Sequence, residues 1–125
     1  MMSRHVHATI PAADMARAKA WYKDKLGLTP TREEDVGYIY DLEGGSGFML
    51  YQTPNAGRAP NTLMSFESTD LRHDMAEMRQ RGVRFEEYDM PGLKTVNAVA
   101  EMGGFHSAWF KDSEGNILAI GDAIH

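Results

Sequence analysis

The sequence predicts an α+β fold of two tandem βαβββ modules, whose curved half-sheets enclose a cleft and carry their helices on the outer face. The main observation is a repeat, in which HATIPAADMARAKAWYKDKLG at 7–27 is followed by LMSFESTDLRHDMAEMRQRG at 63–82. Each copy has a short apolar strand, an aspartate, a helical stretch and a glycine. A second echo, DLEGGSGFMLY at 41–51 and DSEGNILAI at 112–120, predicts a similar hairpin turn in each module.

Module one is expected to span residues 5–52. Val6, Ala8 and Ile10 alternate with polar residues, which predicts a half-buried strand over residues 5–10. Asp14 is a good cap for the helix that follows, and Gly27 suits the left-handed position at its end. Three more strands are expected at 28–34, 37–42 and 47–52.

Module two is expected at 62–122, after a linker at 53–61 that is rich in proline and asparagine. Its elements repeat the order of module one: a strand at 62–68, a helix at 70–81, and strands at 83–89, 105–111 and 117–121. The segment 90–104 has no counterpart in module one. It contains three glycines and a proline, and we interpret it as a candidate lid over the cleft.

Length and composition fit one globular domain and exclude several functions. The chain has 125 residues, a net charge of −5 and no cysteine. Disulfides, thiolate zinc sites and cysteine nucleophiles are therefore excluded, and we expect a cytoplasmic protein without a signal peptide or membrane span. The basic residues at 79–84 are flanked by glutamates, so we expect no nucleic-acid binding.

Taken in this order, the motifs resemble those of the vicinal oxygen chelate superfamily, the glyoxalase, bleomycin-resistance and extradiol-dioxygenase group. The resemblance rests on HATIPAAD at 7–14, the helix after it, their repeat at 63–82, and WFKDSEGNILAI at 109–120. It implies one divalent metal in the cleft. The usual ligands are a histidine seven residues before each helix-capping aspartate and a carboxylate on the closing strand of each module.

Carried over to this chain, the resemblance leaves one metal ligand of four. His7 stands seven residues before Asp14, but Leu63 occupies the matching place before the second aspartate. The closing-strand carboxylates correspond to Leu50 and, four residues after the turn glycine, to Ala119. A catalytic metal needs about three protein ligands. We therefore expect no metal and no cofactor, and we do not carry over the metal-dependent activities of the family.

In place of the metal site, the sequence predicts an apolar pocket with an aromatic rim. Strand alternation points His7 into the cleft, together with Leu63, Ser65 and Glu67 of module two. Alignment of Asp41 with Asp112 puts the tyrosines of module one in phase with Trp109. The predicted ligand-binding residues are His7, Tyr38, Tyr40, Leu50, Leu63, Ser65, Trp109 and Ala119. Such a pocket suits a flat or apolar small molecule.

Three functions remain open. We favour a binding protein without catalytic activity that sequesters a hydrophobic or aromatic compound such as an antibiotic, as the bleomycin-resistance branch does. The alternative is a lyase, isomerase or dioxygenase that uses His7 or Glu67 for proton transfer, or an irregular metal site built from His7, Glu101 and His106. The third is a regulatory or structural module whose side chains fill the cavity. The resemblance also implies a homodimer.

Overall fold

The N-terminal half of the chain forms a four-stranded sheet with one helix. In the computed structural model, which describes residues 2–124, the strand order of this sheet is β1-β4-β3-β2. Its elements are β1 (Ala8–Ala12), α1 (Met15–Leu26), β2 (Arg32–Glu34), β3 (Gly37–Asp41), the short 3-10 helix η1 (Glu43–Gly45) and β4 (Gly47–Gln52). β1 runs parallel to β4, whereas the other pairs are antiparallel.

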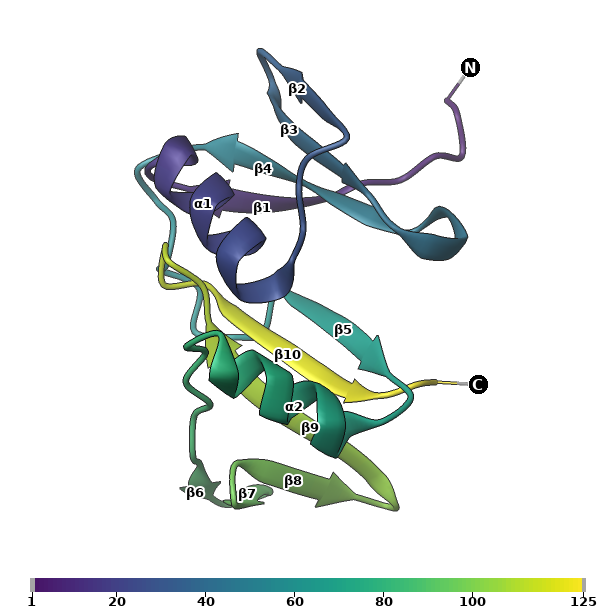
Figure 1. Cartoon of the computed structure of the whole chain (residues 1–125), viewed down its shortest axis with the longest axis vertical. Helices are drawn as coiled ribbons and strands as arrows, with labels where there is room; N and C mark the ends of the chain where they lie inside the picture. Colours follow the sequence, from purple (N-terminus) through teal and green to yellow (C-terminus); the bar gives the residue numbers. More distant parts are fainter. Residues whose placement is uncertain (1, 125) are drawn as a thin grey trace.

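The C-terminal half repeats this arrangement and extends it. Its sheet has six strands in the order β5-β10-β9-β8-β7-β6, and β5 runs parallel to β10. The elements are β5 (Met64–Ser68), α2 (Leu71–Gln80), β6 (Asp89–Met90), β7 (Leu93–Val96), β8 (Val99–Met102), β9 (Phe105–Lys111) and β10 (Ile117–Asp122). These sheets and helices confirm the predicted α+β class (Figure 1).

Both helices begin at the aspartates that the repeat singled out. The side chain of Asp14 accepts a hydrogen bond from the backbone N–H of Arg17, and Asp70 does the same for His73. Gly27 follows α1 with φ of 70°, a left-handed conformation in which its N–H bonds the carbonyl of Lys23. Neither helix in residues 2–124 has the length and hydropathy needed to cross a membrane.

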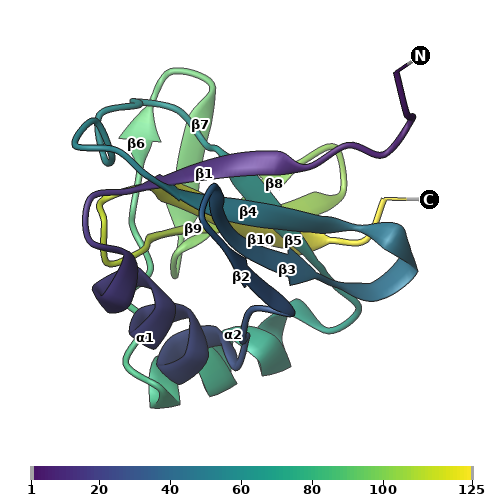
Figure 2. The ribbon, with the colours of Figure 1, turned by 90° about the horizontal axis from the view of Figure 1, so that it is seen from above.

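The two helices lie on the same side of the two sheets, and the opposite sheet faces are free of helices (Figure 2). Side chains that point toward the helices form a shared core. Tyr22 of α1 contacts Tyr40 and Phe48, whose rings stack at 4.5 Å between centroids. Trp21 stacks on Phe110 of the other half at 6.3 Å. We call the helix-free side the open face of each sheet.

The prediction of a lid at 90–104 is wrong, because this segment belongs to the sheet. The pairs Met90↔Leu93, Val96↔Val99 and Met102↔Phe105 each enclose a two-residue hairpin turn. These turns account for most of the glycines and for two residues with positive φ at 97–98. The many turn residues of segment 90–104 therefore indicate a β-meander, in which successive strands are joined by tight turns.

The strand predicted at 83–89 is also wrong. This segment makes an isolated bridge from Phe85 to Phe110 and a hydrogen bond from the N–H of Glu86 to the carbonyl of Trp109. β8 pairs with the first three residues of β9, whereas the Phe85 bridge lies at the other end of β9. The insertion thus supplies the fourth strand of the C-terminal half.

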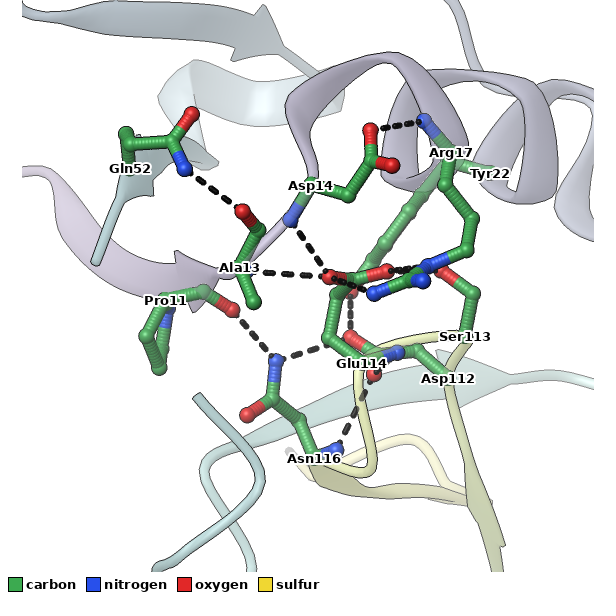
Figure 3. Close-up of polar contacts among 10 residues, drawn as sticks. All are labelled: Pro11, Ala13, Asp14, Arg17, Tyr22, Gln52, Asp112, Ser113, Glu114 and Asn116. Carbon is green, nitrogen blue, oxygen red and sulfur yellow. Dashed lines mark hydrogen bonds and ion pairs between the residues drawn. The ribbon is translucent and has the colours of Figure 1, made fainter. Parts of the chain in front are cut away.

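A polar turn at residues 112–116 joins the two halves (Figure 3). Asp112 accepts a hydrogen bond from the hydroxyl of Tyr22 at 2.7 Å. The amide of Asn116 donates to the carbonyl of Pro11 at the edge of β1, and its oxygen accepts from the N–H of Gly57. Asp112 and Asn116 are both buried, so these bonds are shielded from water. We call this segment the Asp112–Asn116 turn.

Glu114 is the most heavily bonded side chain of that turn. One carboxylate oxygen accepts from the backbone N–H groups of Ala13 and Asp14, both at 2.9 Å. The two oxygens also bind the guanidinium of Arg17 at 2.8 and 2.9 Å, and Ser113 donates at 2.7 Å. The Arg17 bond, together with the backbone bond from Asp14, lowers the pKa of Glu114 to about 2, so the carboxylate is charged at neutral pH.

Candidate functional site

The open face of the C-terminal sheet holds most of the predicted pocket residues of that half. β9 pairs Trp109 with Ala119 of β10, and Ala119 pairs with Ser65 of β5, so the three side chains share one face. Met64, Phe66, Leu118 and Ile120 point to the helix side. The orientations predicted for these strands of module two therefore agree with the structure.

Trp109 is the largest side chain on this open face. It is half-buried, and its indole N–H donates to the hydroxyl of Thr62 at 3.1 Å. Tyr88 contacts it edge-to-face, with 5.7 Å between ring centroids. Burial, and to a smaller extent the Glu86 carboxylate, raises the pKa of Tyr88, which keeps the phenol neutral. The two rings form a rigid aromatic edge beside Ala119.

Tyr88 is a candidate site residue that the sequence reasoning missed. It lies in the segment that was expected to be a regular strand, and its neighbour in space comes from β9. The backbone N–H of Tyr88 bonds the hydroxyl of Thr95 at 2.8 Å, so the inserted hairpin fixes its position. A prediction that puts this ring next to Trp109 would need the strand pairing of the 90–104 insertion.

The orientations predicted for Tyr38, Tyr40 and Leu50 are wrong, because all three point to the helix side. Tyr40 and Leu50 are completely buried, and Tyr38 pairs with Leu50 across β3 and β4. Tyr38 also lies beneath the ammonium group of Lys19 in α1, at 5.8 Å from the ring centroid. These residues belong to the core between the first sheet and α1.

The error comes from a one-residue slip between the two turns. The N–H of Leu42 bonds the carbonyl of Ser46, as the N–H of Asp112 bonds the carbonyl of Asn116. Leu42, and not Asp41, therefore corresponds to Asp112. A slip of one residue in a strand moves every side chain to the other face.

With this register, the four family ligand positions are His7, Met49, Leu63 and Ala119. Thr9 pairs with Met49 as its counterpart Ser65 pairs with Ala119. The corrected position thus offers a thioether where the family has a carboxylate, and two of the other positions are aliphatic. These donors do not fit a divalent metal ion, which needs nitrogen or oxygen ligands here.

His7 lies just outside the first strand, which begins three residues later than predicted. β1 starts at Ala8, whose partner Phe48 is the second residue of β4, so the chain before Ala8 has almost no strand to pair with. His7 is exposed and Val6 is 84% exposed, which contradicts the expected packing of Val6 on the helix. His7 lines a groove with the preceding N-terminal residues and the Leu42–Gly47 segment.

The polar candidates of the open face lie in another groove. Ser65 and Glu67 are exposed and line it together with the residues of the β3–β4 turn. The carboxylate of Glu67 accepts a hydrogen bond from the N–H of Ile124 at 3.2 Å. The structure therefore does not bring His7 and Glu67 into one pocket within a single chain.

The irregular metal site considered from sequence is only partly assembled. Glu101 and His106 pair across β8 and β9, with 3.3 Å between the carboxylate and Nε2. Asp122 holds the other ring nitrogen at 2.9 Å. These three groups lie on the helix side of the C-terminal sheet, whereas His7 lines a groove of the N-terminal half.

Comparisons with known proteins agree with this architecture. A model of the Glyoxalase/Bleomycin resistance protein/Dioxygenase superfamily matches residues 4–120. A search of curated protein sequences finds no significant match. The structural relatives include UcmS2, with a TM-score of 0.75, 20% identity, and coverage of 98% of this chain and 100% of UcmS2.

Two further solved structures show the breadth of the group. The oxidase ChaP-H2 has a TM-score of 0.70 at 17% identity and covers 100% of this chain and 97% of its own. TnmS3, an antibiotic binding protein from Streptomyces sp. CB03234, has a TM-score of 0.66 at 19% identity, with coverage of 99% and 100%. These likenesses establish the fold. With the family model matching nearly its full length, the chain belongs to the glyoxalase, bleomycin-resistance and dioxygenase superfamily.

Proposed function

We propose that this protein binds and sequesters a small hydrophobic or aromatic compound, such as an antibiotic, without a metal ion. The observation that carries the proposal is the indole of Trp109 on the open face, next to the buried Ala119. In the family resemblance, the position of Ala119 belongs to a metal-binding carboxylate. The half-buried indole offers a ligand an aromatic wall, and Ala119 places no polar group beside it.

The neighbouring residues support the same class of ligand. Leu63 and Ile117 are half-buried, Ser65 is exposed, and Tyr88 extends the aromatic wall formed by Trp109. Ser65 supplies a hydroxyl for hydrogen bonding, and His7 supplies an imidazole at the edge of the first sheet. The antibiotic-binding TnmS3 has the same fold, which makes an antibiotic a reasonable first ligand to test.

We also propose that the site is completed in a homodimer. Met49, Tyr51, Leu63, Trp109 and Ile117 are only half-buried on the helix-free faces of a single chain. A second copy related by a two-fold axis would cover these faces and turn each of them into a cleft. Light scattering at micromolar concentration should give the mass of two chains, and the mass of one chain would contradict the dimer.

The enzyme alternative has weaker support. His7 and Glu67 line different grooves of a single chain, so the structure gives them no common site for proton transfer. We expect elemental analysis of the purified protein to find no stoichiometric zinc or transition metal. Close to one metal per chain, lost in His7→Ala, would restore the metalloenzyme alternative.

Tryptophan fluorescence tests the binding site directly. Titration of polycyclic aromatic compounds should change the emission of the wild type. Trp109→Ala removes this signal, so its weaker binding, by about 1–3 kcal/mol, is followed by the ligand-induced rise in melting temperature. Trp21→Phe is the matched control, because Trp21 stacks on Phe110 in the core. Binding that is indifferent to the loss of Trp109, or a broad panel without any response, would refute the proposed site.

A further inference from the structure

A second groove lies on the helix side of the C-terminal sheet, opposite the open face. It has a volume of about 510 Å³ and runs between α2 and the end of the β7–β8 hairpin. His106 of β9 lines it, and His106 points away from the face that carries Trp109 because the two differ by an odd number of residues. This groove is therefore separate from the site proposed above.

The floor of the groove is apolar. Leu71 and Met75 contribute from α2, and Val99 contributes from β8. Met75 is 2% exposed, whereas Leu71 and Val99 are half-buried and thus accessible from the groove. A hydrocarbon group in this position would cover aliphatic surface that now faces water.

Arg72 and Arg79 form a positive rim along α2. They are separated by two helical turns and both line the groove. Among residues 2–124, neither guanidinium has a carboxylate within 4.0 Å. Arg79 lies over the ring of Phe85 at 5.1 Å, which favours an extended side chain.

The acidic group that lines the groove is already engaged. Asp122 accepts from the backbone N–H of His106 at 2.7 Å and contacts Nδ1 of the same residue at 2.9 Å. On the far side of the ring, Nε2 of His106 lies 3.3 Å from Glu101. The charge of Asp122 is therefore directed to His106, and the two arginines are left to attract an anion from solution.

We propose that this groove binds a small amphipathic carboxylate, with its apolar body on Leu71, Met75 and Val99 and its carboxylate on Arg72 and Arg79. A planar guanidinium can offer two parallel N–H donors to a carboxylate, which gives a bidentate contact. The insertion that creates β6–β8 also creates this groove, because the hairpin forms the wall opposite α2. The site does not depend on the binding function proposed for the open face.

The test compares a carboxylate with a neutral compound of the same shape. 4-Phenylbutyrate and 4-phenylbutanol are titrated separately into the full chain, and backbone amide shifts are followed by NMR. We expect the carboxylate to shift amides of α2 and the β7–β8 hairpin and to bind about tenfold more tightly than the alcohol, since tenfold corresponds to about 1.4 kcal/mol, the size of two exposed charge contacts. Equal affinity for the two compounds would overturn the proposal.

Variants locate the contact. Arg72→Gln/Arg79→Gln should reduce the affinity for 4-phenylbutyrate about tenfold and leave that for the alcohol unchanged. Arg58→Gln/Arg84→Gln removes the same charge from exposed positions outside the groove and is the matched control. If both double variants weaken binding equally, the effect is one of net charge and the site is refuted. Trp109→Ala should leave this binding intact, which separates the groove from the open face.

Discussion

The two hairpin turns that close the first and second sheets share a closing hydrogen bond but differ in chemistry. In both, the N–H of the first residue bonds the carbonyl of the fifth, at 2.9 Å in the Leu42–Ser46 turn and 3.0 Å in the Asp112–Asn116 turn. Aligned on that bond, Asp112, Glu114 and Asn116 correspond to Leu42, Gly44 and Ser46. The first turn has therefore lost every side chain with which the second turn binds the opposite half.

Because of this difference, the second turn is hydrogen-bonded to the opposite half, whereas the first turn borders a groove. The second turn is fastened to the end of β1 and the start of α1 by part-buried hydrogen bonds. The first turn faces β5 across an open groove of about 860 Å³, lined by Ser65 and Glu67. A repeated closing bond thus does not imply a repeated function, since the side chains of a turn decide whether it holds two halves together.

Loss of Glu114 should have the largest effect on stability. Glu114→Gln puts an amide NH2 among donors and leaves the guanidinium of Arg17 without its partner, so we expect the free energy of unfolding to fall by about 2–3 kcal/mol. Arg17 is 54% exposed and recovers part of its solvation. Urea unfolding measures the change. Glu43→Gln in the first turn is the control, because Glu43 is exposed, and we expect it to be nearly neutral. Equal effects would show that the two turns do not differ.

Acid should weaken the same junction without a mutation. The pKa of Glu114 is about 2 in the folded protein and 4.5 as its ordinary value, so its stabilising contribution is complete above about pH 4.5 and is lost as pH falls toward 2. We expect the unfolding free energy of the wild type to fall over this window. Glu114→Gln should show a shallower fall there, and parallel profiles would contradict the assignment.

Addition of a methyl group at Gly57 should push the two halves apart. A Cβ at this position would lie 2.4 Å from the carbonyl oxygen of Glu114, and φ is +78°. Gly92→Ala is the matched control, since its φ is +83° but nothing lies within 4 Å. Backbone strain should cost about 1 kcal/mol in both, and the clash should add about 1–2 kcal/mol in Gly57→Ala alone. The melting temperatures of the two variants provide the comparison.

Two tyrosines of one aromatic cluster give the smallest effect. Tyr22→Phe removes the bond to Asp112 and should cost about 1–1.5 kcal/mol. Among residues 2–124, the hydroxyl of Tyr40 is buried without a hydrogen-bond partner, and burial raises the pKa of Tyr40 to about 12. Tyr40→Phe should therefore be neutral or slightly stabilising. If both variants lose equal stability, the hydrogen bond from Tyr22 to Asp112 makes no measurable contribution to the free energy of unfolding.

Local sequence patterns were sufficient to predict the α+β class, both helices with their capping aspartates, and the orientation of β5, β9 and β10. These features depend on local signals, because a cap acts within one turn and alternation acts within one strand. The family resemblance placed Leu63, by its distance from a capping aspartate, and Ala119, by its distance from the turn glycine, at two expected ligand positions. Membership of the superfamily followed from the order of these motifs.

The register of β4 and the role of the insertion depend on contacts that no local pattern in the sequence reveals. Gly44 and Gly45 allowed the first turn to be aligned in two ways, and the wrong choice put Tyr38, Tyr40 and Leu50 on the open face. Turn residues in 90–104 gave no sign that β8 would pair with β9 in preference to 83–89. Register and pairing are set by contacts between segments distant in the chain, where the buried cluster of Tyr22, Tyr40 and Phe48 outweighs any local pattern.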